Sequence, residues 1–242
     1  MMRSKVLTAF ALALAFAVSA TRAVALEKRS VNDTATPQGW SAAGSCAIVY
    51  YNRCTSWSWA WGGFGAGDRY GVCADACWPN GFVGLVGQTQ NRVFTAAPSG
   101  YGFTGTVTIR PADANCCPTG AVLGSQPWLP TGPFDVHNWN VVVPSKFCIV
   151  YTFGPNGEGP ARIGTDHPAA GPTGPAACGF CYPTTRVNHS FYWGTANTPV
   201  CPGSTFFDGI CDAQARVDIF GIPGIGISVE PQTWGGIKSL YR

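Results

Sequence analysis

The chain has 242 residues, a formal net charge of +3 and only 11% charged residues. A nucleic-acid-binding surface needs enough Lys and Arg to neutralise phosphates, and attachment to an anionic membrane surface needs a similar excess of positive charge. The composition therefore excludes nucleic acid and anionic lipid as expected partners. Eleven cysteines, 31 glycines and 19 prolines favour a turn-rich domain with disulfides.

The N-terminus has the organisation of a signal peptide. Arg3 and Lys5 precede the apolar run VLTAFALALAFAV (6–18), and AVA (23–25) offers a cleavage site, with VSA ending at Ala20 as an alternative. The run is shorter than the roughly 20 apolar residues that span a bilayer, so we expect export without membrane insertion. The expected localisation is secreted, either extracellular or at the cell surface.

After the signal peptide at 1–25, the sequence predicts an all-β fold. Residues 26–45 are expected to be a flexible N-terminal lead-in, 46–229 a single antiparallel β-sandwich with a jelly-roll-like arrangement, and 230–242 a C-terminal extension or linker. Short runs rich in β-branched and aromatic residues recur between turn residues, without helical periodicity. These runs are CAIVYY (46–51), RVFTA (92–96), FTGTVTIR (103–110), WNVVV (139–143), FCIVYTF (147–153), HSFYW (189–193) and ARVDIF (215–220).

The stretch CTSWSWAWGGFGAGD carries three tryptophans that alternate with small residues. In a strand, Trp57, Trp59 and Trp61 share one face, which would either line the core or form a flat platform for stacking sugar rings. Each buried aromatic removes about 150–250 Å² from water, and the opposite face offers only Ser, Ala and Gly to a core. We therefore favour the core, and carbohydrate binding by these three residues is the alternative, with Trp78 and Trp128 as candidates in loops.

Behind an export signal, the cysteines predict a disulfide framework. Short separations make Cys46/Cys54 and Cys201/Cys211 candidates for local bridges, and the adjacent cysteines of NCCP are each expected to pair with a distant one. The odd count leaves one thiol free or paired with another chain, so a disulfide-linked dimer is one expectation. The bridge candidates are Cys46, Cys54, Cys73, Cys77, Cys116, Cys117, Cys148, Cys178, Cys181, Cys201 and Cys211.

No catalytic motif is recognised. GxSxG and HExxH are absent, and the glycine run GGFGAGD lacks the Gly-Lys-Ser/Thr ending of a phosphate-binding loop. A glycoside hydrolase needs two carboxylates beside the scissile bond, and no such pair stands out, although aspartates near strand ends leave one open. The chain is therefore expected not to be an enzyme.

No cofactor is expected. Metal binding is a less favoured interpretation of three segments. CGFC (178–181) has the spacing of a redox or zinc half-site, but an oxidising compartment favours disulfides. Asp166 and His167 could ligate a metal, although solvated loop residues are the default. FFDGICDAQARVD (206–218) gathers three aspartates, which keeps structural calcium as a less favoured alternative.

Three segments resemble a group of exported bacterial β-sandwich proteins of uncharacterised function. They are IVYYNRCTSWSWAWGGFGAGDRYGVC (48–73), with its W-x-W-x-W pattern, CPGS…CDA (201–213), and the TWGxIKxxYR-like ending TWGGIKSLYR (233–242). The resemblance implies export and a β-sandwich body, and it brings no catalytic residues. LEKR before Ser30 is instead typical of a fungal processing site, so the source stays open.

The sequence thus predicts a secreted, non-catalytic protein of the cell surface, of adhesion or of the extracellular matrix. Its expected partners are polysaccharide or cell-surface components. A carbohydrate-binding module is the first alternative, and a secreted hydrolase with an unrecognised carboxylate pair is the second.

Overall fold

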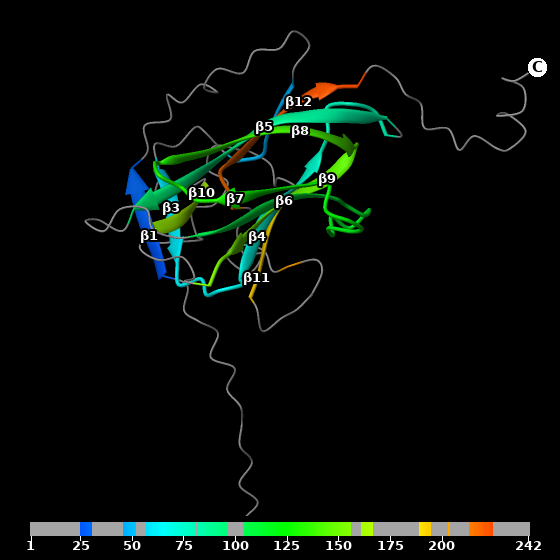
Figure 1. Cartoon of the computed structure of the whole chain (residues 1–242). Helices are drawn as coiled ribbons and strands as arrows, with labels where there is room; N and C mark the ends of the chain where they lie inside the picture. The colour runs from blue at the N-terminus through cyan, green and yellow to red at the C-terminus, as the bar shows by residue number, and fades with distance from the viewer. Residues whose placement is uncertain are drawn as a thin grey trace, which may run out of the picture.

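The computed structural model describes residues 25–30, 46–51, 57–80, 82–95, 104–155, 161–166, 189–194, 203 and 213–224. This part of the chain forms two β-sheets that pack face to face, and neighbouring strands in both sheets run antiparallel (Figure 1). The predicted all-β, antiparallel, disulfide-stapled sandwich is confirmed. Among the described residues, no helix is long and apolar enough to cross a membrane.

The first sheet contains seven strands, β1 (Ala25–Ser30), β2 (Cys46–Val49), β3 (Trp57–Gly62), β5 (Val83–Thr95), β8 (Phe134–Pro144), β10 (Ala161–Asp166) and β12 (Val217–Pro223). Their order is β1-β3-β10-β5-β12-β2, and β8 also pairs with β5. The second sheet contains β4 (Arg69–Asp75), β6 (Gly105–Pro111), β7 (Gly124–Trp128), β9 (Lys146–Phe153) and β11 (Ser190–Trp193), in the order β11-β4-β9-β6-β7.

The core lies between the two sheets because strand side chains alternate between faces. On β8, Asp135, His137 and Trp139 are buried, whereas Val136 and its alternate neighbours are exposed. Aromatic rings of the second sheet and its adjoining loops stack together in the same core, with ring centroids 4.7–5.6 Å apart for most pairs. These rings are Phe64, Tyr70, Trp128, Tyr151 and Phe153.

A smaller apolar cluster covers the outer face of the second sheet. It contains Cys73, Cys148, Val150, Phe191 and Trp193, and it is separate from the main core. The strands β4, β9 and β11 supply these residues from positions that alternate with the core-facing ones. The second sheet is therefore covered on both faces around Cys73.

The N-terminal strand differs from the sequence expectation. Residues 25–30 form β1, which pairs along its length with β3, whereas the sequence places Ala25 at the end of the signal peptide and 26–30 at the start of a flexible lead-in. This segment lacks a strong β pattern, but the outer edge of β3 presents unpaired backbone groups that a neighbouring strand satisfies. Pairing with a distant edge thus overrides weak local propensity.

Candidate functional site

Two of the three tryptophans of the stripe, Trp59 and Trp61, lie in the interior. Trp59 and Trp61 are 5% and 7% exposed and belong to the main core, while the Trp57 side chain lies outside the described residues. Trp61 Nε1 donates a 2.7 Å hydrogen bond to Thr165 Oγ1 on β10. The indoles of Trp59 and Trp61 therefore present no face to a sugar ring.

The opposite face of β3 is covered as well, which the sequence did not indicate. Ser58 and Ala60 are fully buried. Ser58 Oγ accepts a 2.6 Å hydrogen bond from Arg216 Nη1, and Ala60 packs against Phe94. The other tryptophans named as sugar-binding candidates, Trp78 and Trp128, are also buried. Small residues beside the stripe thus mark a strand that is buried on both faces.

A histidine–aspartate pair is enclosed in the core. His137 Nε2 lies 2.7 Å from Asp135 Oδ2, and His137 Nδ1 lies 3.2 Å from Oε1 of Gln126 on β7. Asp135 and His137 are 7% and 6% exposed. Gln126 Nε2 in turn donates to the Asn138 backbone oxygen at 2.6 Å. Because Asp135 and His137 are buried and both imidazole nitrogens face protein oxygens, this pair joins β7 to β8 within the core.

Two tyrosines share this interior. The rings of Tyr70 and Tyr151 stack with centroids 4.9 Å apart, and the Tyr70 hydroxyl accepts a hydrogen bond from Asn91 Nδ2. Burial raises the pKa of both tyrosines well above the usual 10.0, and the charge of Asp135 adds to the increase. Both hydroxyls are therefore neutral near pH 7, and the Tyr70 hydroxyl acts as a structural hydrogen-bond acceptor.

Asp166 is a structural residue, which corrects the expectation of a solvated loop position. It ends β10 and is fully buried, and its Oδ1 accepts a 2.7 Å hydrogen bond from the backbone N–H of Gln214. Gln214 Oε1 accepts from Ser190 Oγ at 2.8 Å, and Ser190 Oγ accepts from the Ala215 backbone N–H. This network joins β10, β11 and the segment before β12. His167 lies outside the described residues.

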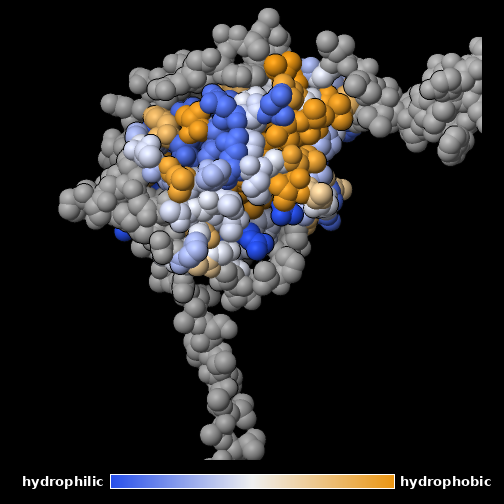
Figure 2. Space-filling view, viewed as in Figure 1, coloured by the Kyte–Doolittle hydropathy of each residue, from blue (hydrophilic) through white to orange (hydrophobic). Residues whose placement is uncertain are grey.

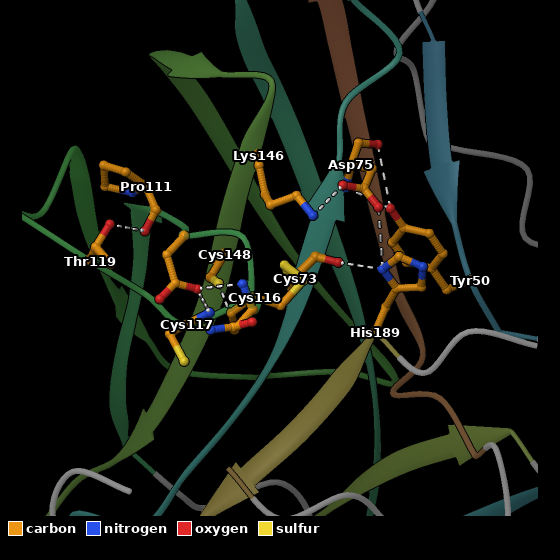
Figure 3. The surroundings of a disulfide bond; sticks show 12 residues. Tyr50, Cys73, Asp75, Pro111, Cys116, Cys117, Thr119, Lys146, Cys148 and His189 are labelled. Atoms are coloured by element: carbon orange, nitrogen blue, oxygen red, sulfur yellow. Dashed lines mark hydrogen bonds and ion pairs between the residues drawn. A yellow bond between two sulfur atoms is a disulfide. The ribbon is translucent and has the colours of Figure 1, made fainter. Parts of the chain in front are cut away.

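A cluster of ionisable side chains, one of them the exposed Asp75, lies at the end of β4 (Figure 3). Asp75 is 55% exposed along its side chain, and its Oδ1 lies 3.1 Å from Lys146 Nζ on β9. Asp75 Oδ2 lies 4.0 Å from His189 Nδ1. The His189 ring stacks on Tyr50 with centroids 3.6 Å apart, and the Tyr50 hydroxyl accepts from the Asp75 backbone N–H at 2.7 Å.

Burial controls the protonation of the two stacked rings. It raises the pKa of Tyr50 to about 12 and lowers the pKa of His189 below its usual 6.5. His189 Nδ1 also lies 3.0 Å from the Cys73 backbone oxygen, an acceptor that partly opposes this decrease. A neutral imidazole beside one carboxylate and one ammonium group can form hydrogen bonds with a polar ligand. It does not supply the two facing carboxylates of a glycosidase.

The disulfides staple this end of the molecule. Cys46 on β2 bonds to Cys77, and Cys73 on β4 bonds to Cys116 in the β6–β7 connection. The predicted Cys46/Cys54 bridge is therefore wrong. A strand places Cys46 beside a cysteine 31 positions away, which short sequence separation could not reveal.

The adjacent cysteines behave as expected, since Cys116 pairs across 43 positions and Cys117 is also disulfide-bonded. Cys148 is the free cysteine of the described chain, and it is fully buried. Burial raises the pKa of its thiol to about 12. A dimer bond through Cys148 is thus blocked by its position. The bridge candidates outside the described residues are Cys54, Cys178, Cys181, Cys201 and Cys211.

The described residues contain no group of three or more His, Cys, Asp or Glu side chains arranged to hold a metal ion. Of the aspartates considered for calcium, Asp218 is buried on β12, and Asp208 and Asp212 lie outside the described residues. The CGFC segment (178–181) lies outside them too.

One face of β8 exposes apolar side chains. Val136 and Val142 point away from the core, and Val142 is 59% exposed. Figure 2 shows apolar residues gathered on this side of the molecule, where β8 ends and β5 begins. The exposed large apolar residues of the described chain are Phe82, Val122, Leu123, Leu129, Val136 and Val142. Large contiguous patches of exposed apolar side chains are typical of contact surfaces, whereas singly exposed ones are normal on any protein.

No protein-family model, no curated protein and no solved structure matches the chain.

Proposed function

We propose that the chain is a secreted, non-catalytic β-sandwich protein that acts at the cell surface, in adhesion or in the extracellular matrix. The signal-peptide pattern at 1–25 supports export. Disulfides between Cys46 and Cys77 and between Cys73 and Cys116 fit an oxidising compartment. The expected partners are polysaccharide or cell-surface components.

The observation that carries the proposal is that β8 exposes two apolar side chains, Val136 and Val142, with Asn138 and Asn140 between them. The side chains that could act as acids or bases are, by contrast, occupied by contacts within the protein. His137, Asp135 and Asp166 are buried and hydrogen-bonded within the protein, and the exposed Asp75 is paired with Lys146 and offers no second carboxylate. The surface is therefore better suited to contact than to catalysis.

The test uses the oxidised mature protein and two matched β8 variants. Val142→Asp places a charge at the exposed apolar position of β8, and Asn140→Asp places the same charge at an exposed polar position of the same strand face. Both proteins are checked by near-UV circular dichroism and then sedimented with intact cells and with insoluble polysaccharides. We expect wild type and Asn140→Asp to co-sediment, and Val142→Asp to bind at least tenfold more weakly.

The alternatives predict other results. Turnover of a polymer or ester substrate that is lost on mutating one carboxylate would replace the proposal with the hydrolase. Polysaccharide binding that survives Val142→Asp and disappears in a folded Trp57→Ala variant would replace it with the carbohydrate-binding module. Export is tested separately by N-terminal sequencing of protein from the culture medium, where a start at Leu26 is expected.

A further inference from the structure

Three sulfur-bearing side chains meet on the outer face of the second sheet. Cys73 and the free Cys148 belong to one apolar cluster, and Cys116 packs against it. Cys148 Sγ lies 3.7 Å from the Cys116 backbone oxygen, and Figure 3 shows Cys148 beside the Cys73–Cys116 disulfide. The free thiol is therefore next to an existing disulfide rather than isolated in the core.

The strand register makes Cys148 an alternative partner for Cys73. The two residues are directly opposite in the antiparallel pair of β4 and β9. The Cys73 backbone N–H donates to the His189 oxygen, on the side away from β9, and the Lys146 oxygen of β9 accepts from Ala112 on the side away from β4. Cys73 and Cys148 thus form a non-hydrogen-bonded pair.

Opposed residues of such a pair have their side chains on one face and Cα atoms about 4.5 Å apart, within the range that a disulfide spans. The two cysteines are 75 positions apart in the sequence, less than twice the 43 that separate Cys73 from Cys116. The loop-closure entropies of the Cys73–Cys148 and Cys73–Cys116 bonds therefore differ little.

The existing partner, Cys116, occupies a strained turn. Its φ is 62°, and it is the one residue other than glycine with positive φ in the described chain. Asp113 holds this turn, because its Oδ1 accepts from the backbone N–H groups of Asn115 and Cys117, both at 2.8 Å. A non-glycine residue in this region is unfavourable and persists because its surroundings fix it. Release of the Cys116 sulfur would remove one of those constraints.

We propose that Cys73, Cys116 and Cys148 form a thiol–disulfide exchange site that turns Cys116 into an accessible, modifiable thiol. The Cys148 thiolate attacks Cys73 Sγ, a bond forms between these two sulfurs, and the Cys73–Cys116 bond breaks. Cys116 leaves as a thiolate and takes a proton from water. One disulfide and one thiol are present before and after, so the step needs no oxidant or reductant.

The exchange moves the free thiol from a fully buried strand to a half-buried turn. Burial raises the pKa of the Cys148 thiol to about 12, with the Asp113 charge adding to this and Lys146 opposing it. Arg110 is opposite Cys148 on β6. Very little of the Cys148 thiol is ionised at pH 7, so the exchange is slow there and speeds up with pH.

The test follows the free thiol in the oxidised mature protein without added thiol. Samples held at pH 7, 8 and 9 are labelled with a maleimide while folded, acid-quenched, digested without reduction and analysed by mass spectrometry. We expect maleimide on Cys116 and a Cys73–Cys148 cross-linked peptide, both appearing about tenfold faster for each pH unit. The Cys148→Ala variant should show neither product.

The Cys46–Cys77 bond is the internal reference, since exchange through global unfolding would scramble it as well. Disulfide-linked peptides that join Cys46 to a new partner would overturn the proposal. So would maleimide that reaches only Cys148, through unfolding, and never Cys116. A second variant tests the geometry alone. Oxidised Cys116→Ala should form the Cys73–Cys148 bond with native circular dichroism, and two reactive thiols in that folded variant would refute it.

Discussion

The buried position of Trp61 makes a quantitative prediction about stability. With 93% of its surface removed from water, this indole contributes an apolar area of about 200 Å², or about 5 kcal/mol at 25 cal/mol per Å². We expect Trp61→Ala to lower the free energy of unfolding by about 3–5 kcal/mol. In a domain of this size that change lowers the Tm by about 6–20 °C.

A milder variant isolates the hydrogen bond from Trp61 Nε1 to Thr165 Oγ1. Trp61→Phe keeps most of the apolar contact but leaves the buried Thr165 hydroxyl without its indole donor, at a cost of about 1–3 kcal/mol. Adding Thr165→Val to Trp61→Phe should recover about 1 kcal/mol of that loss, because both polar partners are then absent.

The assay is urea unfolding of the oxidised proteins, with the midpoint and the m-value fitted for each. Leu129→Ala serves as the control, since Leu129 is 55% exposed and its loss should change stability by less than about 0.5 kcal/mol. If Trp61→Ala matched this control and lost polysaccharide binding instead, the indole would be a surface platform and the core argument would be wrong.

Three further predictions concern a disulfide, a glycine of β4 and the histidine before β11. Replacing both cysteines of the Cys46–Cys77 bond with Ser should cost about 2–4 kcal/mol in urea unfolding, and an unchanged midpoint would show that this bond does not stabilise the fold. Gly71→Ala should cost about 1–3 kcal/mol because its Cβ would clash with the Ile149 backbone oxygen and lie 2.7 Å from a Phe191 ring atom, whereas Gly132→Ala, with open space around it, should be neutral. Burial lowers the pKa of His189, so the unfolded chain binds a proton first as pH falls. The contribution of His189 to the free energy of unfolding is therefore complete above about pH 7 and decreases below about 6.5. In a His189→Phe variant, the fall of the urea midpoint with pH should be smaller by this contribution. Equal pH profiles for the two proteins would contradict that assignment.

Local pattern was sufficient for several strands. FTGTVTIR (103–110) and FCIVYTF (147–153) coincide within two residues with β6 (Gly105–Pro111) and β9 (Lys146–Phe153). Their β-branched and aromatic residues fit a pleated, half-buried surface wherever the strand is placed. The all-β class and the sandwich followed from such runs and the turns between them.

Other strands depend on distant partners. β5 runs over Val83–Thr95, whereas the sequence pattern indicated only residues 92–96 of it. Its first half, VGLVGQTQ, is weak in β-propensity but pairs with β8 on one side and β12 on the other. Hydrogen bonding on both edges stabilises a strand that its own side chains do not specify.

The sequence established the export pattern, the cysteine-rich composition and the strand-forming runs, because each depends on neighbouring residues alone. The bond of Cys46 to Cys77, the burial of Asp166 and the location of Cys148 opposite Cys73 come from the register between strands far apart in the chain. A shift of one residue in that register would turn these side chains to the opposite face of the sheet. The candidate surfaces and the sulfur cluster are thus properties of the packed sheets, and no local pattern specifies them.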